Sequence, residues 1–567
     1  MKRLFISVIS AYCIFCQSLQ LPSDSVPDII YADSITVFAD FIRSNRQHIE
    51  VNTLHAHPNH ISELFDSHSA LLASTYGGSG TLSELKINGS PANHSLVLME
   101  GFRQNNFQNG SFNLSNSTGL NVSAYDIYVN GASSQFGSDA MAGALNILIG
   151  QTNDSFADSY ASIGSYNRWQ FENRIALKIR KWHVQLAQHV DQSDNYFPYF
   201  KNNRDLAYRN GADHQRSEYQ AILQFQSENW YWKSLYKYNF NDSGVPGPKR
   251  NLTVPFQPGK VRQLDESGLL ISKLRFHQND SFLEAGFAIN PQQLDYLSNH
   301  YENLQNSAYL NFSKQFGGHW FSQSKIDFIT AELDGNTGLN RIKADRYLLA
   351  LSQQFAWANS LRNPDIAIDL TFRHEWLDFD TNPLMLELIV KKMLWQSLYL
   401  SGRFATHFRQ PTFNELYWPQ AGNPNLNPEH GISRSIQLDW RENANSFHIE
   451  YLHHNYSDLI VWTTDNLSQL TVKNINRSFQ SAWKLSGKYQ LKPFSFQLEF
   501  LHQVYKQNEK NALNVIPNEL TCSLTYEKPD FAASFSWNWT DHYYDFNSPN
   551  LYPQRNDLRL RFNYRFD

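Results

Sequence analysis

DLRLRFNYRF, residues 557–566 near the C-terminus, alternates strictly between polar and apolar side chains. In an extended strand, successive side chains point to opposite faces. One face would carry Leu558, Leu560, Phe562, Tyr564 and Phe566. The other face would carry Asp557, Arg559, Arg561, Asn563 and Arg565. A strand of this length can cross about 25 Å of hydrocarbon at a tilt, and an apolar face opposite a charged one is typical of a membrane barrel wall.

The same alternation recurs from about Ser155 onward, in segments that end in Asn, Asp, Gly, Pro or a charged pair. The clearest earlier copy places Phe531, Ala533, Phe535, Trp537 and Trp539 on one face. Arg180-Lys181 joins two such segments with no room for a loop, which predicts a tight periplasmic hairpin. The longer connections at 191–205 and 418–430 are expected to be extracellular. A soluble sandwich is the alternative, but its strands rarely expose so many rings.

Composition supports a barrel over a soluble enzyme. The chain has 567 residues, of which 14% are aromatic and only 18% charged. No window holds 18 consecutive apolar residues after the first twenty, so transmembrane helices are excluded. The net charge of -5 has both signs spread along the chain, which makes a nucleic-acid partner unexpected. Outside the N-terminal segment Cys522 stands alone, so no internal disulfide or Cys-based metal site is expected.

Four regions are predicted along the chain. Residues 1–20 read as an export signal, with Lys2 and Arg3 before an apolar stretch that is too short to span a bilayer. A lipoprotein signal is the disfavoured alternative, because neither Cys13 nor Cys16 follows a small residue. Residues 21–45 form an extension, residues 46–152 a separate globular domain of mixed α/β character, and residues 153–567 the barrel.

Several motifs resemble those of TonB-dependent outer-membrane receptors. In the extension, one segment resembles the TonB box of the family. It consists of Asp33, Ser34, Ile35, Thr36, Val37, Phe38 and Ala39. In the globular domain, 85–89, 95–102 and 131–149 are similar to plug strands and turns of the family. The plug-defining structural residues are Gly89, Glu100, Gly101, Gly131, Gly137 and Gly143. In the barrel, 409–417 running into 422–429 resembles the family's strand-to-loop passage.

The resemblance implies both fold and function. The expected fold is a membrane all-β protein, a 22-stranded antiparallel transmembrane barrel with an α/β plug in its lumen. The expected activity is TonB-dependent import of a scarce nutrient across the outer membrane of a Gram-negative bacterium. Its partners would be the TonB complex, outer-membrane lipid and a small-molecule nutrient, and the chain would be a monomer. No enzymatic activity and no resident cofactor are expected.

Some positions depart from the family pattern. The family usually places arginines and a glutamate on the plug strands to lock the plug to the wall. The matching positions here are Asn88, Tyr125, Ile127 and Asn130. Glu100 stands where aspartate is usual, and the chain ends in Phe566-Asp567 instead of a terminal aromatic residue. A weaker or rebuilt lock is therefore expected.

The resemblance also places the ligand site at the apical loops of the plug. The residues predicted to bind ligand are Tyr76, Gly77, Gly78, Ser79, Arg103, Gln104, Asn105, Asn106, Phe107 and Gln108. Amides can hydrogen-bond a ligand of mixed polarity while a ring supplies contact area. The competing interpretation is ordinary loop chemistry, since Asn, Gly and Ser dominate turns.

Metal and catalytic sites are not expected. His55, His57 and His60 lack a carboxylate or thiolate cluster, so a solvated linker is favoured. His453 and His454 would point to opposite faces of a strand. Calcium bound by Asp191, Asp194 and Asp205 is possible through oxygen ligands, but an acidic loop is favoured. Gly77-Gly78-Ser79-Gly80 lacks the following Lys-Ser/Thr that phosphate binding needs.

Three hypotheses about the function stay open. The alternative to active import is a passive porin or adhesin-like barrel without energy coupling, and an export barrel for polysaccharide ranks last. The short chain and the plug motifs are similar to cobalamin and ferric-siderophore receptors. The sequence does not name the ligand, and an iron complex is preferred only because such receptors are common in the family.

Overall fold

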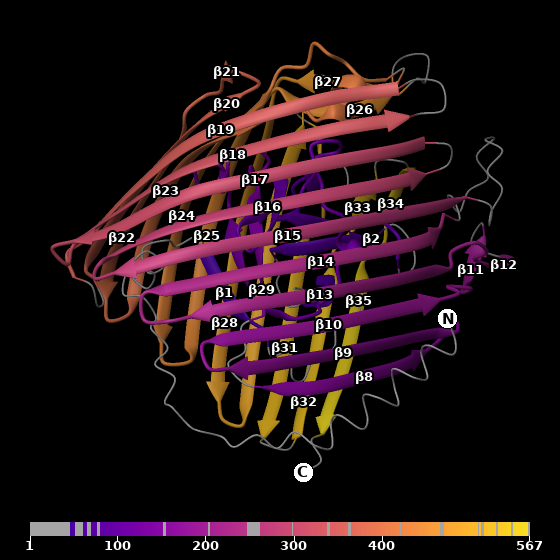
Figure 1. Ribbon diagram of the computed structural model, residues 1–567, viewed down its shortest axis with the longest axis horizontal. Helices are drawn as coiled ribbons and strands as arrows, with labels where there is room; N and C mark the ends of the chain where they lie inside the picture. Colours follow the sequence, from indigo (N-terminus) through magenta and orange to yellow (C-terminus); the bar gives the residue numbers. More distant parts are fainter. Residues whose placement is uncertain are drawn as a thin grey trace.

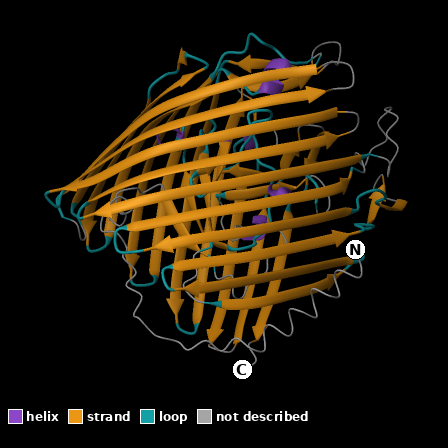
Figure 2. Ribbon diagram, viewed as in Figure 1, coloured by secondary structure: helices purple, strands orange, loops and turns teal. Residues whose placement is uncertain are grey.

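A computed structural model shows a barrel of long strands with a small domain inside it (Figures 1 and 2). The structure describes residues 46–51, 61–64, 70–75, 80–150, 155–201, 205–245, 261–296, 299–336, 341–360, 364–419, 421–464, 470–507, 510–511, 515–528, 531–545 and 548–564. The predicted export signal and the predicted TonB box at 33–39 lie outside these residues.

The inner domain, called the plug below, is built on a five-stranded sheet in the order β1-β6-β7-β4-β5. Strand β4 pairs with β7 in parallel, and the other neighbours are antiparallel. Its strands are β1 (Arg46–Glu50), β4 (Ser95–Met99), β5 (Phe102–Arg103), β6 (Val122–Val129) and β7 (Gly143–Ile149). A separate hairpin is formed by β2 (Leu71–Thr75) and β3 (Ser83–Ile87). Its short helices are η1 (Ile61–Leu64), η2 (Ala92–His94), η3 (Leu114–Asn116) and α3 (Ser133–Phe136).

The barrel wall follows chain order, each strand antiparallel to the next, and closes through β35 beside β8. The long strands are β8 (Phe156–Gly164), β9 (Arg168–Ile179), β10 (Trp182–Ser193), β13 (His214–Gln226), β14 (Trp230–Gly244), β15 (Arg262–Gln278), β16 (Ser281–Tyr296), β17 (Asn299–Phe316), β18 (Trp320–Asn336), β19 (Arg341–Ala358), β20 (Ile366–Leu377), β22 (Met385–Trp395), β23 (Leu398–Arg409), β24 (Glu429–Glu442), β25 (Asn445–Ser457), β28 (Ser478–Leu491), β29 (Phe494–Gln507), β31 (Asn518–Lys528), β32 (Phe531–Thr540) and β35 (Arg555–Tyr564).

Further short strands extend the connections at the barrel rim. Two-residue segments, β21 (Asp380–Thr381) and β30 (Lys510–Asn511), pair with the ends of β20 and β29. Loop hairpins are formed by β11 (Pro198–Lys201) with β12 (Asp205–Tyr208), β26 (Leu459–Thr464) with β27 (Leu470–Ile475), and β33 (Tyr543–Asp545) with β34 (Ser548–Tyr552). The helix α4 (Phe413–Tyr417) lies in the connection from β23 to β24. The predicted plugged barrel is confirmed, but 22 wall strands are reached in the described residues only by counting β21 and β30, so that number is not confirmed.

The two faces of the wall differ as the alternation predicts. Leu558, Leu560 and Phe562 are about two-thirds exposed on β35, at 67%, 69% and 68%. On β17, Leu310 and Phe312 face outward while Asn311 and Ser313 are buried toward the lumen. Exposed apolar faces this extensive need a covering of lipid. Among the described residues, no helix combines the length and apolar character needed to cross a bilayer.

The turn at Arg180-Lys181 is as tight as predicted. Ile179 at the end of β9 pairs directly with Trp182 at the start of β10. Arg180 takes a positive φ of 57°, a conformation that two-residue hairpin turns require. Since consecutive turns alternate between the two rims, the connection from β10 to β13 lies at the opposite rim, the one predicted to be extracellular.

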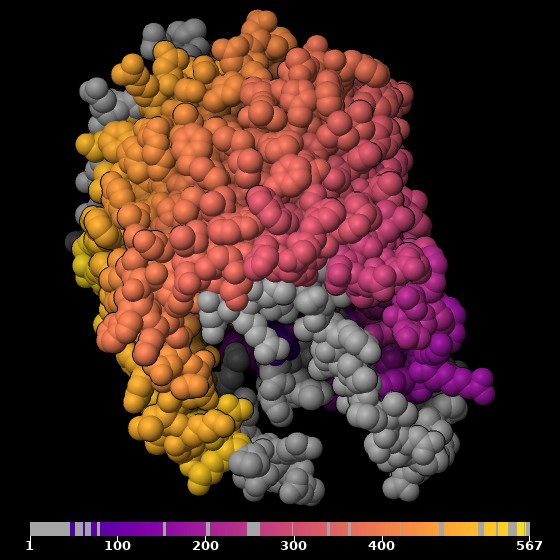
Figure 3. All heavy atoms as spheres, turned by 90° about the vertical axis from the view of Figure 1, so that its left-hand side faces the viewer, coloured from indigo at the N-terminus to yellow at the C-terminus, as the bar shows by residue number. Residues whose placement is uncertain are grey.

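The plug core continues into the inner wall of the barrel. Leu85, Ile127 and Ile147 from the plug pack in one apolar cluster with Leu235 and Ile271 from the wall. This shared core fixes the plug in the lumen by burial, which stabilises by roughly 25 cal/mol per Å² of apolar surface. In the space-filling view, indigo plug atoms are seen through an opening between the lower ends of the coloured strands (Figure 3).

A comparison of two plug glycines distinguishes the cost of backbone strain from the cost of crowding against the wall. Gly101 and Gly137 have nearly equal φ angles, 86° and 87°, but a Cβ at Gly101 would meet nothing within 4 Å. A Cβ at Gly137 would lie 2.0 Å from Oε1 of Glu375 on β20. We expect Gly101→Ala to lower the free energy of unfolding by about 1–3 kcal/mol through strain alone. Gly137→Ala should cost about 1–3 kcal/mol more through overpacking.

Urea unfolding of the two purified variants in detergent, followed by tryptophan fluorescence, measures this difference. Equal losses in the two variants would show that the wall at Glu375 yields freely to the plug.

Candidate functional site

The apical loop of the plug, residues 104–113, rests directly on the barrel helix α4. The backbone N–H of Phe413 donates to the carbonyl of Phe107 at 2.9 Å, and that of Asn414 donates to the carbonyl of Gln108 at 2.8 Å. The first N–H groups of a helix have no partner within the helix, so they are free to bind carbonyls of another segment. The plug loop therefore takes its position from a wall connection of the barrel.

A buried ion-pair cluster holds α4 in place. Arg409, at the end of β23, contacts both oxygens of Glu415 at 3.0 Å and Glu429 at 2.6 Å. Thr412 and Glu415 form a capping box at the start of α4. Plug residue His94 completes the cluster through a 2.6 Å contact from its Nε2 to Glu429. Each carboxylate thus has a partner in its buried position, as a charge there requires.

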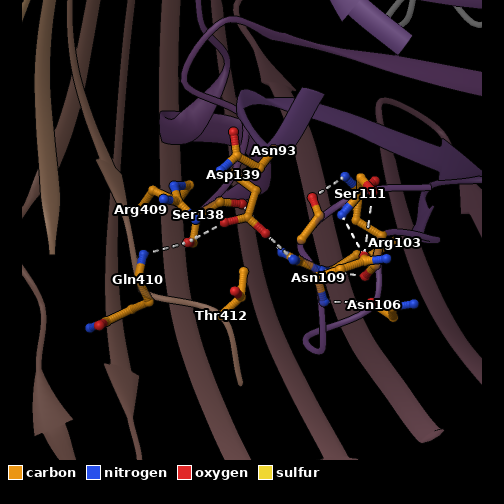
Figure 4. A network of polar contacts seen from close by, with 12 residues as sticks. Asn93, Arg103, Asn106, Asn109, Ser111, Ser138, Asp139, Arg409, Gln410 and Thr412 are labelled. Carbon is orange, nitrogen blue, oxygen red and sulfur yellow. Dashed lines mark hydrogen bonds and ion pairs between the residues drawn. The ribbon is translucent and has the colours of Figure 1, made fainter. Parts of the chain in front are cut away.

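A second network links the loop to the end of α3 (Figure 4). Arg103 forms an ion pair with Asp139, and its Nε donates to the carbonyl of Asn105 at 2.9 Å. The guanidinium of Arg103 also lies over the ring of Phe107, 4.4 Å from its centroid. Ser138 donates to Asp139 at 2.9 Å and accepts from the backbone N–H of Gln410 at 3.1 Å. These bonds connect the apical loop to the plug segment that follows α3 and to the barrel at Gln410.

The residues predicted to bind ligand play different parts. Tyr76, Gly77, Gly78 and Ser79 lie outside the described residues. Asn105 is fully buried and closes the loop, since its amide bonds Val97, Ser95 and Gly110. Gln104 is buried as well and donates to backbone carbonyls. These two amides are occupied by the plug itself.

Among the predicted ligand residues that the structure describes, Asn106 is the partly exposed one, whereas Phe107 and Gln108 are buried. Beside it the structure exposes Asn109 and Tyr417, the latter to 48%, and half-buries Gln410 and Asn414. We call these five side chains, Asn106, Asn109, Gln410, Asn414 and Tyr417, the apical surface. This surface combines amides with one phenol ring. The neighbouring arginine, Arg103, is already paired with Asp139.

The lock between plug and wall is rebuilt with its cations on the barrel. Arg403 of β23 donates to the carbonyls of Asn130 at 2.5 Å and Gly131 at 2.6 Å. Lys484 of β28 donates to the side chain of Asn130 at 2.9 Å, and Asn130 in turn bonds Glu450. Tyr125 and Ile127 are buried in the plug core instead. Barrel cations bound to plug carbonyls replace the plug arginines that the family pattern would supply.

At another point of the interface, Glu100 of the plug binds two barrel lysines. Its carboxylate accepts from Lys233 at 2.7 Å and Lys273 at 2.5 Å, and also from the backbone N–H of Ile149 at 2.8 Å. Burial raises the pKa of Glu100, but the two ammonium groups outweigh burial and lower the pKa to about 2. Glu100, Lys233 and Lys273, called the lysine clamp below, tie the end of β7 to the wall.

The calcium hypothesis for the 191–205 connection does not fit the structure. Asp191 lies inside β10 and is bound by Arg168 at 3.1 Å, Arg216 at 3.2 Å and His214 at 3.0 Å. These partners already neutralise its charge. No group of three or more His, Cys, Asp or Glu in the described residues is arranged to hold a metal ion.

His55, His57 and His60 lie outside the described residues. His454 is buried and His453 bonds Ser481, so the two point to opposite faces as predicted.

Several residues of the site were missed by reasoning from sequence. Ser138, Asp139 and Gln410 come together from segments far apart in the chain. A signal was present for α4, since Thr412 and Glu415 have the spacing of a capping box. The partners of Arg409 were not predictable, because Glu429 belongs to a different strand.

The geometry defines a class of protein: an outer-membrane barrel whose lumen is filled by a separately folded, wall-anchored plug. Residues 45–144 match the family description "TonB-dependent Receptor Plug Domain", and residues 148–567 match "TonB dependent receptor-like, beta-barrel". The chain belongs to the TonB-dependent receptors. Its place is therefore the outer membrane of a Gram-negative bacterium.

Individual relatives are more distant. A vitamin B12 transporter, BtuB of Photobacterium profundum, is 23% identical over 415 residues, 69% of this chain and 63% of the relative. The chain thus spans less than two-thirds of the length of that relative. Among solved structures, the siderophore receptor PirA from Acinetobacter baumannii has a TM-score of 0.75 at 11% identity, with 93% of this chain and 92% of that chain covered. The copper transporter OprC has a TM-score of 0.74 at 11% identity, with 90% and 88% covered.

Proposed function

We propose that the chain imports a scarce nutrient across the outer membrane, driven by a TonB partner that pulls on residues 33–39. The observation that carries this proposal is the anchoring of the plug. The lysine clamp, Arg403 with its two carbonyls, and the Arg409 cluster tie the plug to the wall at separate points. A passive porin needs an open lumen. A plug that is anchored to the wall closes the lumen, and work is required to move the plug.

The pulled segment suits a pairing partner by its chemistry. Ser34, Ile35, Thr36, Val37 and Phe38 are β-branched, aromatic or small, and such a segment can add to the sheet edge of another protein. Ligand bound at the apical surface would have to favour release of this segment to the TonB partner. That is a coupling free energy between two sites of one domain.

For the ligand, the apical surface supports a molecule rich in amide groups and without strong negative charge. Its side chains are amides and one phenol, and Arg103 is neutralised by Asp139. A multiply charged anion would find no free cation among the five apical side chains. Together with the relatedness to a vitamin B12 transporter, this favours a corrinoid such as cobalamin over an anionic ferric siderophore. We therefore propose a corrinoid where family frequency alone favours an iron complex.

The test is uptake by cells that lack other receptors for the ligands supplied. They carry the intact chain, a version lacking 33–39, or a control lacking 24–30, which shortens the extension equally. Labelled cobalamin, ferric enterobactin, a ferric hydroxamate and haem are supplied separately. We expect cobalamin to accumulate with the intact chain and the control, and to fall to background without 33–39.

Other outcomes separate the parts of the proposal. Accumulation of an iron complex instead of cobalamin would overturn the ligand assignment while leaving import intact. Equal accumulation with and without 33–39 would overturn energy coupling and support the passive barrel.

A further inference from the structure

One sector of the barrel wall differs from the rest in how little of it is buried. It consists of four neighbouring strands, β31, β32, β35 and β8, where the C-terminal end of the wall meets its first strand (Figure 1). On β8, β32 and β35 no described side chain is buried, and on β31 the buried one is Glu519. Each of the other long wall strands has at least three buried residues. We call these four strands the seam.

Strand pairing shows which side chains of the seam point into the lumen. Phe535 on β32 pairs with Leu560 on β35, and both are exposed on the outer face, at 39% and 69%. Ser536 follows Phe535 and pairs with Ser523 on β31, so both serines point inward. Both serines are partly exposed. Water therefore reaches the inner face of the seam.

The anchors of the plug described above lie on other parts of the wall. Lys233 and Lys273 hold Glu100 from β14 and β15, and Lys484 holds Asn130 from β28. The apolar core that the plug shares with the wall includes residues of β13 to β16. When a pull loosens the plug, the lumen can therefore widen along the seam before all of these anchors have been released.

Small neutral polar side chains line the seam. Its inward residues on β31 and β32 include Thr521, Ser523, Thr525, Ser534, Ser536 and Asn538. Charged side chains on β8 and β35 are paired, Asp158 with Arg174 and Asp557 with Arg555. Hydroxyls and amides can exchange hydrogen bonds with a passing solute without holding it tightly, and passage through a pore requires such weak binding.

We propose that the nutrient crosses the lumen along the seam, between its inner face and the plug. This inference deepens the proposed import function and rests on it. Four strands about 4.8 Å apart span roughly 14 Å of wall, which is comparable with the width of a small-molecule nutrient. The neutral lining suits the ligand inferred from the apical surface, which is rich in amides and carries no strong negative charge.

Reaction with a thiol reagent tests whether water fills the seam, and this test needs no nutrient. The purified receptor carries Cys522→Ser, which removes the thiol on β31, together with either Ser536→Cys or Ser401→Cys. Ser401 is the matched control, because it points inward on β23 but is only 2% exposed. A charged, water-soluble methanethiosulfonate should modify Ser536→Cys at least tenfold faster than Ser401→Cys. Equal rates would overturn the proposal.

Uptake tests whether the nutrient uses the seam. Ser536→Trp places a large ring in the middle of β32 and should reduce accumulation of labelled cobalamin at least tenfold, while cobalamin binding to the cells changes less than twofold. Ser159→Trp is the control, because Ser159 lies on β8 of the same seam but is exposed on the outer face. This control should import like the wild type. The same uptake by both variants would contradict the route.

Modification after folding keeps the test valid if Ser536→Trp folds poorly. Cells with Cys522→Ser and Ser536→Cys should import cobalamin normally until a bulky maleimide is attached, and the same treatment should leave cells with Cys522→Ser alone unaffected. Unchanged uptake after complete modification would overturn the seam as the route and leave import intact. If the wild type accumulates none of the supplied ligands, import itself is refuted, and passage of a nutrient along the seam falls with it.

Discussion

Replacing Arg409 by alanine is expected to lower the free energy of unfolding by about 3–5 kcal/mol, the usual cost of removing one partner from a buried ion pair. Arg409 is fully buried, and its loss would remove the guanidinium from both Glu415 and Glu429, leaving Glu429 its contact with His94. The plug would be affected as well, because α4 carries the apical loop through Phe413 and Asn414. Ligand binding should weaken together with stability.

Urea unfolding in detergent, read by tryptophan fluorescence, measures the loss. Arg409→Lys should be intermediate, since a lysine keeps the charge but cannot make the forked contact to both carboxylates. Arg434→Ala, an exposed position on the adjoining strand β24, should change stability by less than about 0.5 kcal/mol. If Arg409→Ala unfolds at the same urea concentration as Arg434→Ala, the cluster does not hold α4.

Replacing Glu100 by glutamine should loosen the plug without unfolding the barrel. Lys233 and Lys273 would lose their shared carboxylate, and Lys233 is almost fully buried, where an unpaired ammonium is strongly disfavoured. We expect the variant to pass ions through planar bilayers at least tenfold more often than the wild type, with no TonB present. Glu50→Gln, an exposed carboxylate on β1 of the same plug, is the matched control.

The lysine clamp also predicts a pH dependence of the wild type. The folded-state pKa of Glu100 is depressed to about 2, below the usual value near 4.5. A carboxyl with a depressed pKa contributes stability above its unfolded pKa and loses it as the pH falls toward its folded pKa. Channel openings of the wild type should therefore rise between about pH 4.5 and pH 2, and those of Glu100→Gln should not. Equal pH profiles for the two proteins would contradict the clamp.

The rebuilt lock bears on how such a plug is released. Arg403 binds main-chain carbonyls of the plug, which any plug sequence offers, while Glu100 is a single plug carboxylate held by two wall cations. Moving the plug would break these contacts at different points of the lumen. A pull applied at one end of the plug can therefore release them one after another, with a smaller barrier at each step than for simultaneous release.

The sequence by itself determined the wall and the kind of protein. A strand that alternates Leu558, Leu560 and Phe562 with arginines has one stable environment, lipid on one face and a polar lumen on the other. The tight turn at Arg180-Lys181 and the opposed faces of His453 and His454 followed from the same local periodicity. Local periodicity suffices here because each strand carries its own two-sided pattern.

Only the tertiary structure decided the charges and contacts inside the lumen. Asn105 looked like a ligand residue but closes its own loop, and Asp191 looked like a calcium ligand but is held by arginines and a histidine. Arg409 meets Glu429, and Glu100 meets Lys233, across long stretches of chain. A buried charge takes its partner from whichever strand faces it in the closed barrel, and that neighbour is set by the wrapping of the wall around the plug, which no local pattern encodes.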